Sequence, residues 1–436
     1  LRREGIALMR FKTGTPPRVR RDSIDFSVLE EQPGELHPLP YSSDTPEDAF
    51  EGAPQTSCHI VYTTPETHRI ITENIHRSAM YSGQIHGTGP RYCPSIEDKV
   101  VRFADKPRHQ LFVEPMGADN EEMYIQGFST SMPSDVQYQM LRSLPGFERA
   151  EIMRYAYAIE YDCGDPTQLS ASLEFKSVRG LFGAGQFNGT SGYEEAAAQG
   201  LVAGINAALR VRGEPPMELA RSSSYIGTLI DDLITKGTNE PYRMMTSRSE
   251  YRLLLRQDNA EARLTPIGRR VGLISDERYA RFERRQAEIE AEKARLERVH
   301  LSPEAVNDFL AAHGEAAATS GVSLADLVRR PALSYEDTAE LDPSRPKISR
   351  RAALTVGIDI KYAGYIRREL AEAKRHAKLE DYRLPSGIDY AAVRGLRIEA
   401  AQKLNKFRPE TIGQASRISG VNPADISVLL IFLGKR

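Results

Sequence analysis

The sequence predicts an α/β protein with an α+β unit near its start and a helical C-terminal half. Between about residues 20 and 170, short β-like runs alternate with helical stretches and with loops rich in glycine and proline; the clearest runs are 59–64, 110–114 and 156–161. Residues 180–200 are typical of a short strand, a glycine-rich turn and a strong helix. Beyond residue 213 the β character fades, and residues 276–299 form a highly charged helix typical of a solvated face.

The composition sets bounds on the class of protein. A chain of 436 residues with 40% hydrophobic content can bury two or three cores. A net charge of -2 excludes a globally basic nucleic-acid binder, although local basic faces can still hold phosphates. Cys58, Cys93 and Cys163 are too few and too scattered for a disulfide framework or a CxxC metal site, so we expect a reducing cytoplasm and no metal. The sequence has no apolar run of about 20 residues, so we expect no membrane span.

The first residues are typical of the interior of a longer chain. Leu1 is not a methionine, and residues 1–12 read as the end of an amphipathic helix followed by a strand. We therefore expect a further segment before Leu1. Residues 12–18, KTGTPPR, contain two prolines, which predict that the chain leaves the strand there in a rigid turn.

The glycine-rich turn at residues 183–185 is the first candidate site. Small residues let backbone amides approach a ligand, and Ser191 with Glu194 predicts a capping box. A helix from about Tyr193 would direct its positive end at the turn, which favours a negatively charged ligand there. An ordinary turn between a strand and a helix remains an equal alternative.

The helix after this turn has an apolar stripe in the sequence. Leu201, Ile205 and Ala208 would form its buried face, while Gly200 and Gly204 would permit close packing on a sheet.

Residues 87–103 form the second candidate site. Arg91 and Lys99 flank Cys93, and a helix that begins near Pro94 or Ser95 would add its positive end, so a thiolate nucleophile could be stabilised there. The alternative is a buried, inert cysteine, which is the role we expect for the other two cysteines.

Residues 242–270 form a local basic stretch. Seven arginines are opposed there by three acidic residues and are interleaved with Tyr242 and Tyr251. Guanidinium groups suit phosphates and aromatic rings can stack on bases, so RNA contact is one reading and a salt-bridged surface is the other.

The C-terminal residues 403–436 contain a clear helix start at Asn422 and Pro423. Residues 426–433 are apolar nearly all round, which predicts burial against a partner or against the protein's own domain.

Several long strings together resemble the MnmG/GidA family, the large subunits of enzymes that modify tRNA wobble uridine. These strings are KTGTPPR (12–18), SIDFS (23–27), MYSGQIHGTGPRYCPSIEDKVVRFAD (80–105), GAGQFNGTSGYEEAAAQG (183–200), EPYRMMTSRSEYRLLLRQDNAEARLT (240–265) and IGQASRISGVNPADISVLL (412–430). They span nearly the whole chain in the family's order.

The resemblance implies an α/β FAD-binding domain, Rossmann-like and of the glutathione-reductase type, with an inserted α+β domain and an all-α C-terminal domain. Residues 1–15 and 171–212 would be the remainder of the FAD-binding domain, residues 16–170 the insert for NADH and substrate, and residues 213–436 the helical domain for tRNA and a GTPase partner. The family's GxGxxG turn and its second functional cysteine match nothing in these residues, which implies that both lie upstream.

The resemblance also implies site residues. FAD contacts are expected at Gly183, Gly185, Gln186, Gly189, Thr190 and Glu194. The nicotinamide-nucleotide segment is expected at Gly89, Pro90, Arg91, Tyr92, Cys93, Pro94, Ser95, Ile96, Glu97, Asp98, Lys99, Val100, Val101, Arg102 and Phe103. Contacts to tRNA are expected at Arg243, Arg248, Tyr251, Arg252 and Arg256. Cys93 matches a functional cysteine of the family, and we expect it to add to C6 of the uracil or to assist that chemistry.

The implied activity is the FAD- and NADH-dependent addition of a carboxymethylaminomethyl or aminomethyl group to C5 of tRNA uridine 34. Methylenetetrahydrofolate would donate the one-carbon unit, and glycine or ammonium the amine. The implied assembly is a cytoplasmic homodimer with an MnmE-type GTPase. One alternative is the folate- and FAD-dependent methyltransferase of tRNA uridine 54, which lacks the long helical domain. Another is a noncatalytic RNA- or partner-binding remnant, which would gain nothing from Cys93 or the glycine turn.

Overall fold

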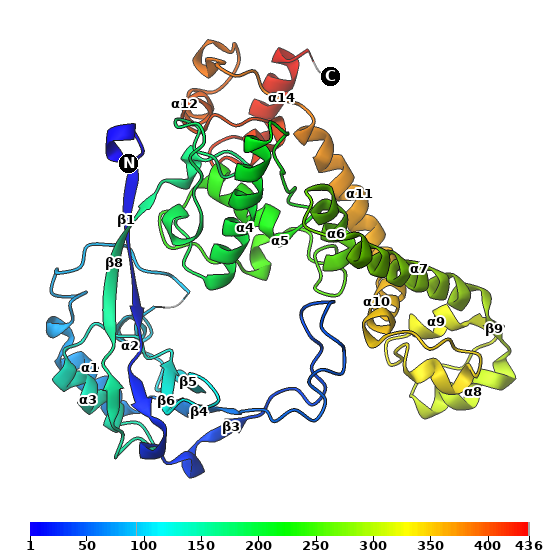
Figure 1. Cartoon of the computed structure of the whole chain (residues 1–436), viewed down its shortest axis with the longest axis horizontal. Coiled ribbons are helices and arrows are strands. Elements are labelled where there is room, and N and C mark those ends of the chain that lie inside the picture. The colour runs from blue at the N-terminus through cyan, green and yellow to red at the C-terminus, as the bar shows by residue number, and fades with distance from the viewer. Residues whose placement is uncertain (93, 435–436) are drawn as a thin grey trace.

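The computed structural model describes residues 1–92 and 94–434, which form three lobes (Figure 1). One lobe holds the large β-sheet, a second holds residues 165–270 together with the C-terminal residues, and a third is an elongated group of helices. The expected order, mixed α/β elements followed by helices, is confirmed. No helix in the described ranges is long and apolar enough to cross a membrane.

The first lobe is built on a six-stranded antiparallel sheet. Its strands, in spatial order, are β3 (Glu30–Gln32), β4 (Cys58–Tyr62), β5 (Gln110–Pro115), β6 (Glu122–Gln126), β2 (Arg18–Arg20) and β7 (Ile152–Arg154). Leu111 and Val113 in β5 are fully buried whereas Phe112 between them is exposed, as strand periodicity requires. The buried face packs against α1 (Pro65–Glu73), α2 (Ile96–Arg102) and α3 (Ser134–Arg142).

A two-stranded antiparallel ribbon connects this lobe to the second one. It consists of β1 (Leu8–Thr15) and β8 (Tyr157–Gly164), which pair over all eight residues. The prediction that the chain turns from Lys12 onward is therefore wrong in part. Because β8 supplies a backbone partner as far as Thr15, the strand continues to that residue and the turn is confined to Pro16 and Pro17.

The second lobe packs around α4 (Tyr193–Val211), with α5 (Tyr225–Asp231) and α6 (Ala260–Arg270) beside it. The predicted apolar stripe of α4 is wrong in part. Ile205 packs against the core, but Leu201 is 53% exposed, and the buried face includes Val202, Asn206 and Leu209. The polar Asn206 can be buried because its amide bonds to the backbone of Ser172 and Met217.

The two glycines of α4 also differ from their expected role. A side chain at Gly200 or Gly204 would meet nothing within 4 Å, so neither glycine is needed for close packing in this structure. The predicted short strand before the glycine turn is wrong as well, since residues 181–184 are irregular apart from an isolated bridge between Glu174 and Phe182.

The third lobe has its own hydrophobic core. Its elements are α7 (Asp276–Arg298), β9 (His300–Leu301), α8 (Pro303–Ala312), β10 (Val322–Ser323), α9 (Leu324–Val328) and α10 (Arg350–Lys361). Helix α11 (Ala363–Glu380) then returns the chain to the second lobe (Figure 1). The predicted charged helix at residues 276–299 is confirmed by α7, whose N-terminal cap is Ser275.

The C-terminal bundle contains α12 (Ile398–Phe407), α13 (Ile412–Arg417) and α14 (Pro423–Phe432) around one core. The predicted helix start is confirmed, because Asn422 and Asp425 form a capping box at α14. Within the bundle Leu429 is buried whereas Ile431 is 72% exposed, so the protein's own domain covers only part of the apolar run.

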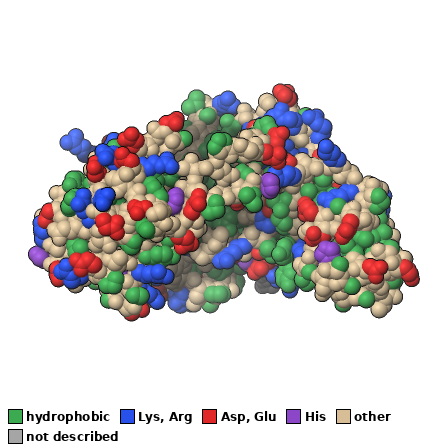
Figure 2. Space-filling view, turned by 90° about the horizontal axis from the view of Figure 1, so that it is seen from below, with side chains coloured by type: hydrophobic (Ala, Val, Ile, Leu, Met, Phe, Trp, Pro, Cys, Tyr) green, Lys and Arg blue, Asp and Glu red, His purple; other side chains and the backbone are tan. Residues whose placement is uncertain are grey.

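An acidic loop of residues 33–57 reaches from the first lobe to the third (Figure 1). Asp44 forms ion pairs with Arg278 at 2.9 Å and with Arg281 at 3.1 Å in α7. The carboxylate of Glu47 accepts hydrogen bonds from the backbone N–H groups of Arg350 and Arg351, the first two residues of α10. The loop thereby links the two lobes, and Figure 2 shows the recess that remains between them.

Candidate functional site

A cleft lies where β1, the loop before α2 and the loop after β6 meet. Its lining residues are Lys12, Thr13, Gly14, Met80, Gly89, Pro90, Pro94, Ser95, Asp98, Ser129, Thr130, Ser131 and Ala158. Three segments that are far apart in the sequence therefore form one site.

The loop before α2 is fixed to the ribbon by backbone contacts. Glu160 of β8 accepts hydrogen bonds from the N–H groups of His86 at 2.8 Å and Gly87 at 2.6 Å. Gly87 lies so close to β1 that a Cβ atom there would be 2.7 Å from the carbonyl carbon of Phe11. Any side chain would push this loop away from β1, so residue 87 must be glycine for the cleft to form.

Lys12 is half-buried at the floor of the cleft, and sequence reasoning missed it. Burial lowers the pKa of its ammonium group, while the charge of Asp98 acts in the opposite direction. Gly89 leaves room for this side chain, because a Cβ atom there would be 2.7 Å from the Cε atom of Lys12. The N–H group of Lys12 donates to the carbonyl of Thr88 at 3.0 Å, which places Lys12 beside residues 89–95, and residue spacing alone did not reveal this.

The N-terminus of α2 forms another wall of the cleft, as expected. Ser95 caps the helix by accepting a hydrogen bond from the N–H group of Asp98 at 3.3 Å. The hydroxyl of Tyr81 donates to Asp98 at 3.0 Å, and burial together with this carboxylate raises the pKa of Tyr81 to about 12. Cys93, the expected nucleophile, lies outside the described residues.

Glu97 holds the third wall in place. This carboxylate is fully buried, and its Oε1 atom accepts hydrogen bonds from the N–H and hydroxyl groups of Ser131, both at 2.8 Å. The N–H group of Ile96 donates to the carbonyl of Ser129 at 2.8 Å. These contacts attach residues 129–131, which sequence reasoning also missed, to the start of α2.

The structure divides the expected nicotinamide segment into three groups. Gly89, Pro90, Pro94, Ser95 and Asp98 line the cleft. Ile96, Glu97 and Val100 are buried below it, and Lys99 donates to the carbonyl of Gly127. The side chains directed toward solvent are those of Arg91, Tyr92, Val101, Arg102 and Phe103. Among the described residues of this segment, those of the first group are the ones that line the cleft.

The glycine-rich turn leads into α4 with a different cap from the predicted one. Gly192 is the N-cap and makes no side-chain bond, so the capping box of Ser191 and Glu194 is wrong. The N–H group of Ser191 donates instead to the carbonyl of Tyr242. Among the described residues, the N–H groups of Gly192, Tyr193 and Glu194 have no hydrogen-bond acceptor, and such groups bind negative charge.

The other expected flavin contacts are placed around the same turn. Gly185 and Gly189 have φ angles of 69° and 81°, which favour glycine, and they are buried together with Gly183. Thr190 is fully buried and accepts a hydrogen bond from Gln199 at 3.0 Å. The side chains of Gln186 and Glu194 are exposed. The turn fits an anionic group at the amides of α4, next to Gln186.

Two residues of the basic stretch, Tyr251 and Arg256, contact other parts of the protein. Tyr251 is buried, and its hydroxyl lies 2.7 Å from Nδ1 of His376. Arg256 forms ion pairs with Asp258 at 2.9 Å and Asp359 at 2.8 Å. Both residues therefore stabilise the fold in this arrangement.

Three other arginines of the stretch, Arg243, Arg248 and Arg252, are partly or fully exposed. The guanidinium of Arg248 stacks over the ring of Tyr242 at 4.8 Å, and Arg252 is exposed. Arg243 lies 3.5 Å from Glu195 and keeps 40% of its side chain exposed. Of these three residues Arg252 is the most exposed, whereas Arg243 is ion-paired and the Nε atom of Arg248 is buried.

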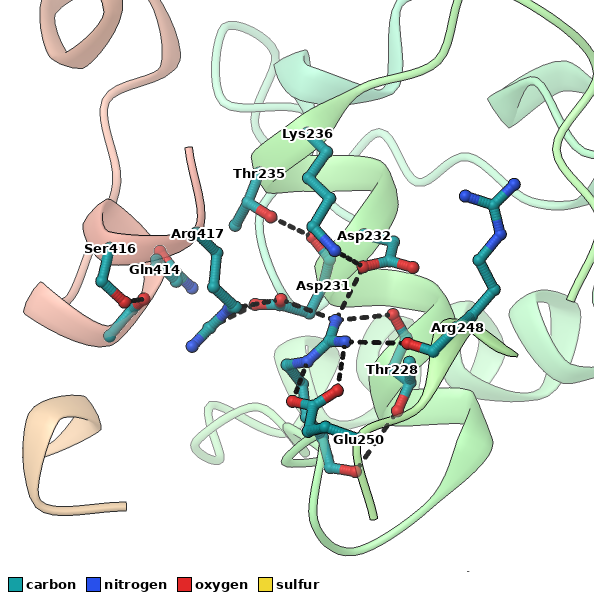
Figure 3. A network of polar contacts seen from close by, with 12 residues as sticks. Thr228, Asp231, Asp232, Thr235, Lys236, Arg248, Glu250, Gln414, Ser416 and Arg417 are labelled. Carbon is teal, nitrogen blue, oxygen red and sulfur yellow. Dashed lines mark hydrogen bonds and ion pairs between the residues drawn. The ribbon is translucent and has the colours of Figure 1, made fainter. Parts of the chain in front are cut away.

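A buried ionic network connects this stretch to the C-terminal bundle (Figure 3). Arg221 donates to Asp231 at 3.1 Å, to Asp232 at 2.7 Å and to Glu250 at 2.7 Å. Arg417 of α13 donates to Asp231 from the other side at 2.6 Å. The network was not predicted, because its members are spread over nearly 200 positions of the sequence.

Comparisons with known proteins give one consistent family. The family model described as glucose inhibited division protein A matches residues 1–215. Models of the tRNA modifying enzyme MnmG/GidA match residues 276–370, as its C-terminal helical domain, and residues 372–436, as its C-terminal helical bundle.

Individual relatives and solved structures agree. The chain is 58% identical over 434 residues to the tRNA uridine 5-carboxymethylaminomethyl modification enzyme MnmG of Caldicellulosiruptor saccharolyticus, covering 99% of this chain and 69% of that protein. The protein of the same name from Bacillus subtilis is 55% identical over 430 residues, which are 98% of this chain and 68% of that protein. The form II crystal structure of Aquifex aeolicus GidA matches with a TM-score of 0.88 and 47% identity, covering 100% of this chain and 68% of that one.

Proposed function

The chain belongs to the MnmG/GidA family, and from this premise we propose that it acts in the modification of tRNA wobble uridine. The reaction is the addition of a carboxymethylaminomethyl or aminomethyl group to C5 of uridine 34. The observation that carries the proposal is the 58% identity, over 99% of the chain, to a relative named for this modification.

The proposed cofactors are FAD and NADH, with methylenetetrahydrofolate as the one-carbon donor. FAD would supply redox chemistry and carry the one-carbon unit. In this chain the free amides at the start of α4 would hold a negatively charged part of the flavin, and Gln186 would lie at its edge. NADH would approach along residues 89–103, of which the cleft-lining residues are the candidates for contact.

The proposed nucleophile is Cys93, which would add to C6 of the uracil and raise the electron density at C5. Support comes from its neighbours, because Pro94 and Ser95 on one side and Gly89 and Pro90 on the other line the cleft.

The proposed partners are tRNA, a GTPase subunit of the MnmE type and a second copy of the chain, in the cytoplasm. Arg243, Arg248 and Arg252 would hold tRNA phosphates, since Arg252 is exposed and Arg243 keeps 40% of its side chain exposed beside its ion pair with Glu195. Residues 403–433 would dock the GTPase. The proposed domains are residues 1–15 with 171–212 for FAD, 16–170 for NADH and substrate, and 213–436 for tRNA and the GTPase.

The proposal is tested in cells that lack their own enzyme of this kind. The complete gene is introduced, and tRNA nucleosides are analysed by mass spectrometry. We expect restoration of modified wobble uridine by the unaltered gene and none by Cys93→Ser expressed at the same level. Absence of restoration by the unaltered gene, with folded protein present, would leave the noncatalytic alternative, and methylation at position 54 instead would support the methyltransferase.

A further inference from the structure

Two opposite charges line the cleft without neutralising each other. Lys12 and Asp98 both face it, but within residues 1–92 and 94–434 they form no ion pair with each other. The ammonium of Lys12 has no hydrogen-bond acceptor in those ranges either. Asp98 is 8% exposed, and its Oδ1 atom accepts from Tyr81, which leaves Oδ2 available. A half-buried cation and a buried carboxylate are thus both open to a ligand.

Two hydroxyl groups in the same cleft have hydrogen atoms to donate. Thr130 is 2% exposed, and its Oγ1 atom accepts from the N–H group of Met132, so its own proton is free. Ser129 is 9% exposed, and its hydroxyl makes no bond to any described residue. Ser131 differs, because its hydroxyl donates to Glu97. Both hydroxyl groups line the cleft and can donate a hydrogen bond to a polar ligand there.

We propose that this cleft binds a small α-amino acid as a zwitterion, with its carboxylate at Lys12, Ser129 and Thr130 and its ammonium at Asp98. The inference rests on the proposed function, in which an amine donor joins the modified uridine, and it assigns that donor to this cleft. Of the two amine donors, glycine and ammonium, only glycine carries a carboxylate as well as a positive charge. Lys12 would bind that carboxylate and would therefore be a specificity-determining residue that favours glycine over ammonium.

The charges favour a zwitterion over a phosphate group. A phosphate would satisfy Lys12 but would bring two negative charges near the buried carboxylate of Asp98, which is unfavourable where water is excluded. The zwitterion satisfies both residues and adds no net charge. Burial also lowers the pKa of Lys12, so the ammonium group gains from an arriving carboxylate.

The first test measures competition between the two donors in the complete enzyme with its tRNA, cofactors and GTPase partner. Glycine and ammonium are supplied together, and both nucleoside products are quantified. Lys12→Met should lower the ratio of glycine-derived to ammonium-derived product at least ~10-fold, because a charge-assisted hydrogen bond is lost. Lys12→Arg should recover part of the ratio. The matched control is Lys106→Met, which removes an exposed lysine beyond α2 and should leave the ratio unchanged.

The second test measures binding without turnover. Calorimetric titration of the complete protein with glycine should give saturable binding that weakens at least ~10-fold in Lys12→Met and in Asp98→Asn. Asp105→Asn, at an exposed aspartate, is the control for the loss of a negative charge. Circular dichroism spectra establish that each variant is folded.

The outcomes separate this inference from the proposed function. If the protein binds glycine in a way that depends on Lys12 but makes neither product, the amino-acid site is supported and the proposed function is rejected. An equal loss of both products in Lys12→Met, together with weaker NADH binding, would overturn the inference and assign Lys12 to the dinucleotide. Absence of saturable glycine binding to a protein that makes the glycine-derived product would also overturn it.

Discussion

Arg417 and Asp231 form a two-point contact between the C-terminal bundle and the second lobe. The Nε and Nη2 atoms of Arg417 each donate to one carboxylate oxygen of Asp231 at 2.6 Å (Figure 3). On its other side Asp231 accepts from Arg221, which also donates to the carbonyl of Arg248. The position of the bundle is therefore coupled to the backbone of the basic stretch.

We expect Arg417→Ala to loosen the bundle from the second lobe. Asp231 is 8% exposed and would keep only Arg221, so the loss should be about 2 kcal/mol, as for a hydrogen bond to a charged group. The midpoint of urea unfolding, followed by circular dichroism, measures it. Arg383→Ala is the control, because Arg383 is 62% exposed and its pair with Glu410 should contribute no more than about 1 kcal/mol. Equal effects of the two substitutions would show that the two-point contact has no special role.

The capping box of α14 should give a pH-dependent contribution to stability. Hydrogen bonds from Arg397 and from the N–H group of Asn422 lower the pKa of Asp425, whose side chain is 1% exposed. A carboxyl group with a lowered folded-state pKa stabilises the fold above its unfolded value of about 3.9, and this contribution is lost as the pH falls through the folded pKa.

Asp425→Asn should therefore destabilise the protein equally at pH 7 and pH 5, by about 1.5–3 kcal/mol, and by less below pH 4. Urea unfolding at several pH values measures the difference. A difference that stays constant down to pH 3 would contradict the assigned role of the charge.

The three cysteines should differ in reactivity. Burial raises the pKa of the Cys163 thiol to about 11, and burial together with Glu114 raises that of Cys58. Both thiols are therefore mostly protonated at pH 7.5 and should react slowly with iodoacetamide. If Cys93 is the nucleophile, limited alkylation followed by peptide mass spectrometry should find it labelled at least ~10-fold faster than Cys163. Faster labelling of Cys58 than of Cys93 would argue against an activated thiolate.

The exposed arginines should contribute to tRNA affinity through phosphate contacts. We expect Arg248→Ala with Arg252→Ala to weaken binding and to reduce the salt dependence, because each lost phosphate contact lowers the slope of log K against log salt by about 0.7–0.9. Filter binding at several salt concentrations measures both quantities. The control is the double variant Arg284→Ala with Arg298→Ala, which removes two positive charges at exposed positions of α7, outside the basic stretch. The same loss in both double variants would indicate a general charge effect.

Local signals in the sequence were sufficient for many elements of the fold. Alternating apolar residues predicted β4, β5 and β8, the run of interspersed charges predicted α7, and Asn422 with Pro423 marked the start of α14. These features depend on residues close in sequence, so a single chain displays them. The mixed α/β and helical order followed from the same signals.

Features that depend on distant partners could not be predicted. Asn206 lies on the buried face of α4 because backbone groups of Ser172 and Met217 satisfy its amide, and helical periodicity does not show such partners. Tyr251 was expected to meet RNA but is buried beside His376. The cleft was likewise recognised only from residues 87–103, because Lys12 and Ser129–Thr130 reach it through strand pairing and the buried Glu97.

The most direct test of the account is a covalent trap at the cleft. A tRNA that carries 5-fluorouridine at position 34 is incubated with the complete enzyme, because fluorine at C5 should stabilise an adduct formed at C6. Digestion and mass spectrometry then locate the modified peptide. We predict one adduct, on the peptide containing Cys93, and none with Cys93→Ser. An adduct on a residue outside this cleft, or activity without any adduct in the unaltered enzyme, would contradict the assignment of the cleft as the place where uridine 34 reacts.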